Sequence, residues 1–280
     1  MNNFKQTLKL FGKLILPVLI FIVMQTLCSA IMLTRIAVND PELQESMLNG
    51  DEEAALELTS RITPSMLAVT VLVSGLATAL LLRILKYWKI RQAFNPKNLT
   101  FKFVILSFIG AAAGIFSTNI LSEQMALEDT MGATFQDMSS TVLGFICIGV
   151  VGPICEEIVF RQALMGTMLR NGFRISTAIT VSAMIFGFVH MNPDQIPFAF
   201  LMGIILGVIY CMTGNIVVTS IVHIVNNSLA VWQMSMITEG QQPESLTYDV
   251  FGSRPVAYAV CMVGAIICIE ILRRLWYQKL

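Results

Sequence analysis

Eight long apolar stretches restrict the fold of this chain more than any other feature. They cover residues 14–34, 65–85, 102–121, 139–169, 174–191, 196–213, 215–237 and 255–275. An α-helix of about 20 apolar residues crosses the hydrocarbon core of a bilayer. Only 13% of the 280 residues are charged, whereas soluble domains carry about 25%. The sequence therefore predicts an all-α polytopic membrane protein.

The fourth stretch, residues 139–169, is too long for one plain span. Gly152 and Pro153 lie in its middle, and proline cannot donate the backbone hydrogen bond that continues a helix. We therefore expect a kink or a break there.

Basic residues predict the orientation of the eight spans, because Lys and Arg concentrate in cytoplasmic segments. With the N-terminus inside, 14 of the 18 Lys and Arg residues fall in inner segments. The outer segments hold three, which are Arg35, Arg61 and Arg254. Both termini are therefore expected in the cytoplasm.

Three formal charges lie well inside a predicted span, namely Glu156, Glu157 and Arg161 in the sequence CEEIVFRQ. A charge at the bilayer centre costs about 2.5–3.5 kcal/mol even on the insertion scale. Glu157 and Arg161 are four residues apart, so they share a helix face and can pair. Glu156 is rotated by about 100° from Glu157 and needs partners from another helix.

Both histidines of the chain also lie in apolar stretches. His190 ends the sequence FGFVH, and His223 begins HIVNN, in which Asn227 follows one turn later. At 1.5 Å per residue, Glu156, His190 and His223 lie ~21, ~24 and ~12 Å from the inner ends of their predicted helices. These side chains can therefore meet in one broad polar layer.

This set of residue types suits hydrolysis. A buried glutamate can take a proton from water near neutral pH, while histidine and asparagine can donate to a developing oxyanion. Glu156, His190 and His223 could instead ligate zinc, although the HExxH motif of soluble zinc proteases is absent. No GxSxG motif is present either.

Three motifs resemble those of one membrane-protein family. EEIVFR, which begins at Glu156, is similar to the EExxxR motif of the CPBP family, which comprises type II CaaX prenyl endopeptidases and Abi-like bacteriocin-processing or immunity proteins. FGFVH at His190 is similar to its FxxxH motif, and HIVNN resembles its HxxxN motif. The motifs occur in order, about 33 residues apart, and the resemblance covers residues 139–237.

The resemblance implies an intramembrane endopeptidase and gives each motif residue a role. Glu156 would activate the attacking water together with His190. His223 and Asn227 would stabilise the oxyanion. Structural roles would fall to Glu157 and Arg161, which would hold the site together, and to Phe186, which would shape the pocket wall. The preferred mechanism uses glutamate and no cofactor, with a zinc-dependent one as the alternative.

The chain then divides into three parts. Residues 1–138 hold the first transmembrane helices and an acidic outer loop at about 38–63, which reads as a solvated or interfacial helix. Residues 139–237 form the catalytic core of the CPBP type. Residues 238–280 supply an outer loop and the last transmembrane helix.

Two other functions remain open. One is a non-catalytic membrane partner or bacteriocin-immunity protein. The other is a transporter or proton relay, since intramembrane Glu, Arg and His also mark ion pathways, but the polar residues lack the two-fold repetition of many transporters.

The expected partners are the lipid bilayer and a membrane-associated peptide or protein substrate, CaaX-like or other. No basic tract indicates nucleic-acid binding. GAAAG at 110–114 and GIILG at 203–207 allow close helix packing; we read both as intramolecular, with a homodimer as the alternative. In a prokaryote the location would be the plasma (inner) membrane.

Overall fold

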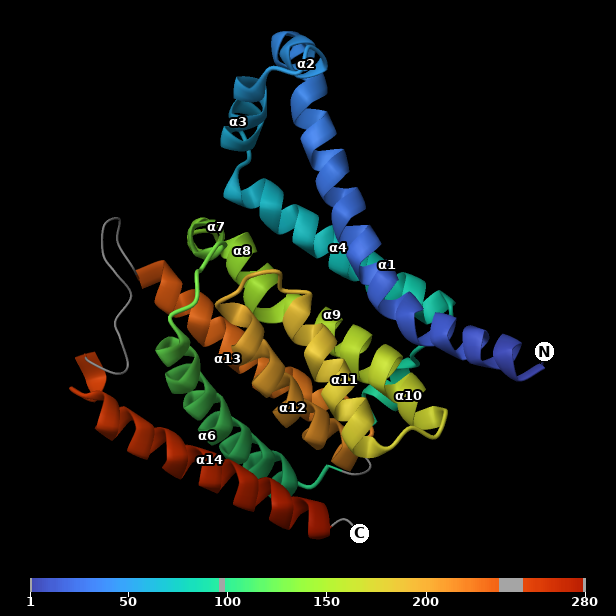
Figure 1. Cartoon of the computed structure of the whole chain (residues 1–280), viewed down its shortest axis with the longest axis vertical. Coiled ribbons are helices and arrows are strands. Elements are labelled where there is room, and N and C mark those ends of the chain that lie inside the picture. The colour runs from blue at the N-terminus through green and yellow to red at the C-terminus, as the bar shows by residue number, and fades with distance from the viewer. Residues whose placement is uncertain (1, 96–98, 237–248, 279–280) are drawn as a thin grey trace.

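Helices make up all the regular secondary structure that this computed structural model describes, which covers residues 2–95, 99–236 and 249–278. The all-α prediction is confirmed. Figure 1 shows long helices running side by side along one diagonal. Residues 237–248, which include most of the predicted last outer loop, lie outside the described residues.

Within the described residues, six helical segments are long and apolar enough to cross a membrane, so the chain is an integral membrane protein. Four of them are the single helices α4 (Pro64–Ile84), α6 (Phe101–Met125), α12 (Gln195–Thr213) and α14 (Arg254–Tyr277). The first lies within α1 (Asn2–Val38). The remaining one, Val142–Arg170, is a continuous run of α8 (Val142–Ile146), η2 (Cys147–Val151), α9 (Gly152–Glu157), η3 (Ile158–Met165) and α10 (Gly166–Arg170).

The other two expected spans are also helices. α11 (Ile175–Phe188) is shorter than the expected 174–191, and α13 (Val217–Met236) matches 215–237 closely. Eight crossings therefore stay a prediction, because α11 is too short to qualify as a span by its length. The early end of α11 has a consequence for the site, since it leaves His190 outside the helix.

The long helices form three groups in Figure 1. α1 packs against α4 on one side, and α14 packs against α6 on the other. The segment α8–α10, α11, α12 and α13 lie between these pairs. α1 begins and α14 ends at the same end of the bundle, as an even number of crossings requires. Which end faces the cytoplasm stays a prediction.

The predicted acidic loop at 38–63 contains two short helices, α2 (Pro41–Leu48) and α3 (Glu52–Ser60). Leu43, Ala54 and Leu58 are buried and pack on the end of α1. Asp40 caps α2, and the backbone N–H of Leu43 with the guanidinium of Arg61 holds the pKa of the Asp40 carboxyl below its usual range. This helical pair therefore folds against α1.

The expected break at Gly152 and Pro153 is absent, and the helix continues through two π-helical segments instead. In η2 the Gly152 N–H donates to the Cys147 carbonyl, five residues back. This wider turn accommodates the proline ring, which in an α-helix would clash with the carbonyl four residues before it. π-helical turns are rare and occur frequently at functional sites.

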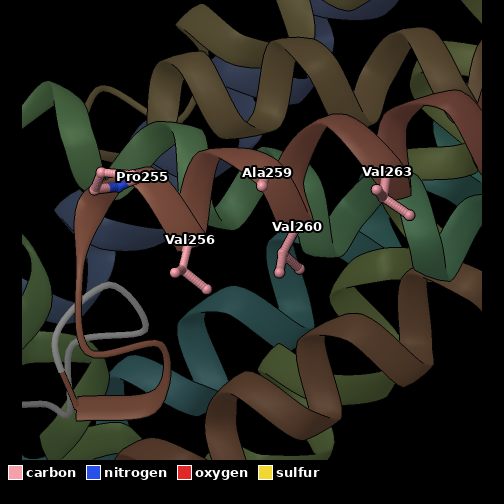
Figure 2. Close-up of a pocket in the computed structure, with 5 residues that line it drawn as sticks. All are labelled: Pro255, Val256, Ala259, Val260 and Val263. Carbon is pink, nitrogen blue, oxygen red and sulfur yellow. The ribbon is translucent and has the colours of Figure 1, made fainter.

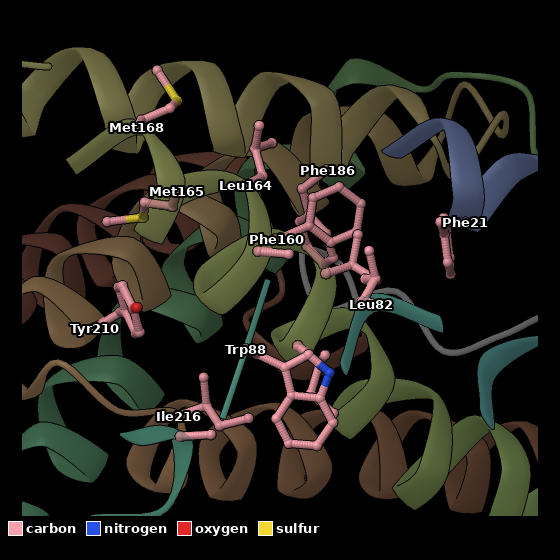
Figure 3. Close-up of a cluster of buried hydrophobic side chains, with 14 of the residues drawn as sticks. Phe21, Leu82, Trp88, Phe160, Leu164, Met165, Met168, Phe186, Tyr210 and Ile216 are labelled. Atoms are coloured by element: carbon pink, nitrogen blue, oxygen red, sulfur yellow. The ribbon is translucent and has the colours of Figure 1, made fainter. Parts of the chain in front are cut away.

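A buried apolar cluster surrounds the centre of the bundle (Figure 3). Phe160 of η3 contacts Phe21 of α1 and Phe186 of α11 edge-to-face, at centroid distances of 5.9 and 5.1 Å. Trp88 donates its indole N–H to the Ala79 carbonyl at 2.8 Å. The central helix η3 is thus packed against neighbours on several sides, which fixes the position of its charged residue, Arg161.

Both small-residue motifs lie at helix contacts within the chain. A Cβ at Gly114 of α6 would lie 2.6 Å from Sγ of Cys268 and 2.7 Å from Cδ1 of Ile205. A Cβ at Gly203 of α12 would lie 3.0 Å from Cβ of Ala183 on α11. The motifs therefore permit close packing of neighbouring helices.

We expect Gly114→Val to lower the melting temperature of the purified protein, because overpacking a tight contact costs about 1–3 kcal/mol. Gly12→Val is the matched control, since a Cβ at Gly12 would meet nothing within 4 Å. An unchanged melting temperature together with an altered oligomeric state would show instead that residues 110–114 face a second copy.

Candidate active site

An ion pair lies in the central helix at the junction of α9 and η3. Glu157 is the last residue of α9, and Arg161 lies in η3. Arg161 Nε is 3.3 Å from Glu157 Oε2, and the two side chains are 1% and 0% exposed. The four-residue spacing brings the two charges together, so each reduces the cost of burying the other.

His223 of α13 lies between the two glutamates. Its Nδ1 is 3.3 Å from Glu157 Oε1, and its Nε2 is 3.5 Å from Glu156 Oε2. The His223 side chain is 2% exposed, whereas that of Glu156 is 21% exposed. Both glutamates thus have His223 as an interhelical partner, but Glu156 keeps access to the surroundings, whereas Glu157 is fully buried.

Phe186 of α11 is the common neighbour of the polar groups. Its ring meets the rings of His190 and His223 edge-to-face, at centroid distances of 4.9 and 5.7 Å. The Arg161 guanidinium carbon lies 5.0 Å from the same centroid, which is a cation–π distance. Phe186 is 1% exposed, so it forms an apolar floor that spaces the two histidines.

His190 lies two residues beyond the end of α11, in a turn. The expectation that it belongs to the helix 174–191 is wrong at this end. His190 Nδ1 is 2.7 Å from the Phe186 carbonyl oxygen. A carbonyl oxygen only accepts hydrogen bonds, so Nδ1 carries the proton and, in the neutral ring, Nε2 is left as an acceptor.

Asn227 and Ser228 of α13 bind backbone carbonyls of η2. Asn227 Nδ2 donates to the Ile148 oxygen, and Ser228 Oγ donates to the Gly149 oxygen, both at 3.3 Å. These carbonyls lie five and four residues before Pro153, which has no N–H to offer them. The two side chains therefore compensate for the proline and fix α13, with His223, against α9.

Three more polar side chains lie near the site but outside the predicted set. Asn226 donates to Asn227 Oδ1 at 3.0 Å, although its helical position suggests a different face. Thr219 lies near Glu157, with its hydroxyl donating to the Ile216 carbonyl, and its place one turn before His223 could have indicated this. Gln162 is fully buried beside Arg161. The position of Gln162 next to Arg161 in the sequence is the only signal that could have placed it at the site.

The alternative zinc set does not converge in the described residues. No group of three or more His, Cys, Asp or Glu side chains there is arranged to hold a metal ion. His223 directs its two ring nitrogens to separate glutamates. This arrangement does not fit a site made by Glu156, His190 and His223, and we derive no step through a metal.

A depression on α14 lies apart from these polar groups (Figure 2). It is lined by Pro255, Val256, Ala259, Val260 and Val263, all apolar. None of these residues belongs to the motifs, and the surface suits lipid contact rather than hydrolysis.

We expect Arg161→Ala to cost about 3–5 kcal/mol in the free energy of unfolding, because it leaves Glu157 as an unpaired buried charge. The measurement is the yield and melting temperature of purified protein. Arg274→Ala is the matched control: Arg274 pairs with Glu270 at the same four-residue spacing but is 70% exposed. Equal effects of the two substitutions would contradict the prediction.

Comparison with known proteins finds a family model that is similar to the central third of the chain. The family model described as type II CAAX prenyl endopeptidase Rce1-like matches residues 138–229. This range holds all three motifs and agrees with the resemblance over residues 139–237. No solved structure gives a match.

Three curated proteins are similar to parts of the chain. The membrane-embedded CAAX protease MroQ of Staphylococcus aureus (strain USA300) is 35% identical over 89 residues, which are 30% of this chain and 36% of that protein. YdiL of Bacillus subtilis (strain 168) is 28% identical over 129 residues, 46% of this chain and 52% of that protein. CAAX prenyl protease 2 of Arabidopsis thaliana is 42% identical over 43 residues, 15% of this chain and 14% of that protein.

The matched regions thus span about half or less of each relative. Within them, the family match covers the helices that carry Glu156 and His223 and the loop that carries His190. Residues 138–229 are thus similar to the Rce1-like family of type II CAAX prenyl endopeptidases.

Proposed function

We propose that this chain is an intramembrane endopeptidase in which Glu156 activates the attacking water. The observation that carries the proposal is the contrast between the paired glutamates. Glu157 is fully buried and paired with Arg161, while Glu156 is 21% exposed and lies 3.5 Å from His223 Nε2. One carboxylate is thus structural, and the other can reach a bound water.

In the first step, water attacks the carbonyl carbon of the scissile peptide bond and transfers a proton to the Glu156 carboxylate. The new carbon–oxygen bond produces a tetrahedral oxyanion. Glu156 then delivers the proton to the amide nitrogen as the carbon–nitrogen bond breaks. The products are a carboxylic acid and an amine, which exchange a proton to become a carboxylate and an ammonium group, and the glutamate returns to its ionised state.

The histidines support this cycle from two sides. His223 Nε2 faces the Glu156 carboxylate from α13 and can hydrogen-bond an oxygen bound beside that carboxylate. His190 presents Nε2 as an acceptor for the second proton of the attacking water, because its Nδ1 is bound to the Phe186 carbonyl. Asn227 Nδ2 carries two N–H donors: one binds the Ile148 carbonyl, and the other can donate to an oxyanion.

The substrate proposed is a membrane-associated peptide or protein, since the polar site lies among helices that cross the bilayer. The names of two relatives refer to CAAX proteins, which makes prenylated C-terminal peptides the first class to test. A membrane partner without catalytic activity is the second candidate, and the following experiment separates the two.

We expect Glu156→Gln to abolish cleavage without loss of folded protein, because an amide cannot accept the proton of the attacking water. Wild type and the variant are expressed at matched levels in cells lacking the protein, and termini of membrane proteins are compared by mass spectrometry. Glu270→Gln, in an exposed ion pair of α14, is the control and should yield the wild-type termini.

Two outcomes would contradict the proposal. New termini that persist in the Glu156→Gln protein would show that another group is the base. Identical termini with and without the wild-type protein, together with a phenotype shared by both versions, would favour the non-catalytic partner.

We also expect Glu156-dependent cleavage to persist in purified protein from which metals have been removed. Metal analysis is made on the same preparation. About one equivalent of zinc, lost in both His190→Ala and His223→Ala proteins together with activity, would overturn this prediction and restore the zinc alternative.

A further inference from the structure

His190 is the motif residue whose position the helices explain least. Glu156 lies in α9, and His223 and Asn227 lie in α13, but His190 follows the end of α11. One hydrogen bond, from its Nδ1 to the Phe186 carbonyl, and the ring contact with Phe186 hold the side chain. The path of the loop at 189–194 must therefore be set by other contacts.

Asn192 supplies them, two residues after His190. Its side chain is fully buried although it lies in a loop. Nδ2 donates to Asp129 Oδ1 at 2.8 Å, and Oδ1 accepts from the Thr130 N–H at 3.0 Å and from the Thr130 hydroxyl at 3.3 Å. Asn192 thereby joins the α11–α12 loop to the α6–α7 loop, more than 60 residues earlier in the sequence.

Backbone contacts extend this junction. The Asp194 N–H donates to the Glu128 carbonyl at 3.3 Å, and the Asn192 carbonyl accepts from the Gln195 and Ile196 N–H groups at the start of α12. Asn192 therefore binds the neighbouring loop with its side chain and the next helix with its backbone.

The backbone of Met191, between His190 and Asn192, is strained. Its φ angle is +53°, in the left-handed region that costs a non-glycine residue about 1–2 kcal/mol. Strained residues persist where the surroundings over-determine them, and they cluster at functional sites. The Met191 side chain is exposed and contributes no burial to offset the strain.

We propose that Asn192 is a positioning residue for His190: its hydrogen bonds to Asp129 and Thr130 hold the loop so that His190 Nε2 faces the site. The proposal rests on the proposed peptidase function for its meaning, but the geometry of His190 can be measured without any substrate. Asn192 touches no reacting atom and acts only through the loop.

Asparagine suits position 192 because its amide nitrogen donates to Asp129 and its amide oxygen accepts from Thr130. In Asn192→Asp, the oxygen facing Thr130 is kept, but a carboxylate replaces the donor facing Asp129. Burial and the nearby Asp129 already raise the pKa of the Asp194 carboxyl, so a further negative charge meets repulsion. Asp129→Asn alone is milder, because an amide oxygen can accept the same hydrogen bond.

The double variant Asn192→Asp with Asp129→Asn exchanges the two groups. The new amide at position 129 can then donate to the new carboxylate at position 192, which still accepts from Thr130. The exchange gives up the exposed bond from the Met131 N–H to Asp129 Oδ1 but restores the buried one. Rescue of Asn192→Asp by the second substitution therefore isolates this hydrogen bond from any general effect of the substitution.

The test uses the two histidines of the chain, His190 and His223. Protein labelled with ¹⁵N-histidine is purified in nanodiscs with a tag that lacks histidine, and the ring nitrogens are followed by NMR below the melting temperature. We expect His190 to be protonated at Nδ1 in the wild type. Asn192→Asp should shift or broaden the His190 signals and leave those of His223 unchanged, and the double variant should restore them.

Cleavage gives the second readout. We expect Asn192→Asp to reduce the Glu156-dependent termini by roughly 10- to 100-fold, as expected for a misplaced catalytic group, and the double variant to recover most of the loss.

Unchanged His190 signals in Asn192→Asp would overturn the proposal, whatever the effect on cleavage. Equal changes at both histidines, or no rescue, would likewise show a general structural role. If Glu156→Gln retains activity, the peptidase proposal fails while the NMR comparison still decides the role of Asn192.

Discussion

The buried pair of Glu157 and Arg161 is the interaction on which the rest of the site depends. Each charge alone would be expensive in an apolar helix bundle, and the pair is supported by contacts from two further helices. His223 reaches Glu157 from α13, and the ring of Phe186 lies against the guanidinium from α11. The ion pair therefore draws the three motif-bearing segments together, and Glu156 is placed beside His223 as a result.

Much of this could be predicted from the sequence, because the strongest constraints are local. Long apolar runs predict the all-α membrane fold, and four-residue spacing places Glu157 and Arg161 on one face. Motif spacing indicates which helices meet, but not how. The unbroken path through Pro153 was not predictable, because it depends on donors from Asn227 and Ser228, which lie on another helix.

The position of His190 also depends on contacts that the sequence pattern does not reveal. Hydropathy continues past Phe188 and suggests a helix to residue 191, yet α11 ends earlier. Contacts with residues 128–130, distant in sequence, set the loop that follows. The pattern of a single sequence does not reveal which distant residues contact this loop. Asn192 reads as an ordinary turn residue until its buried partners are seen.

The carbonyl groups freed by Pro153 have a consequence for how the protein is made. A helix in lipid cannot leave backbone acceptors without donors at low cost, and the donors for Ile148 and Gly149 come from α13. These donors follow the proline by more than two helices in the sequence, so the central segment leaves the ribosome well before them. The contacts of Asn227 and Ser228 with these carbonyls can form only after α13 has been made. Completion of the central polar cluster is thus a late event of biogenesis rather than a property of each helix as it inserts.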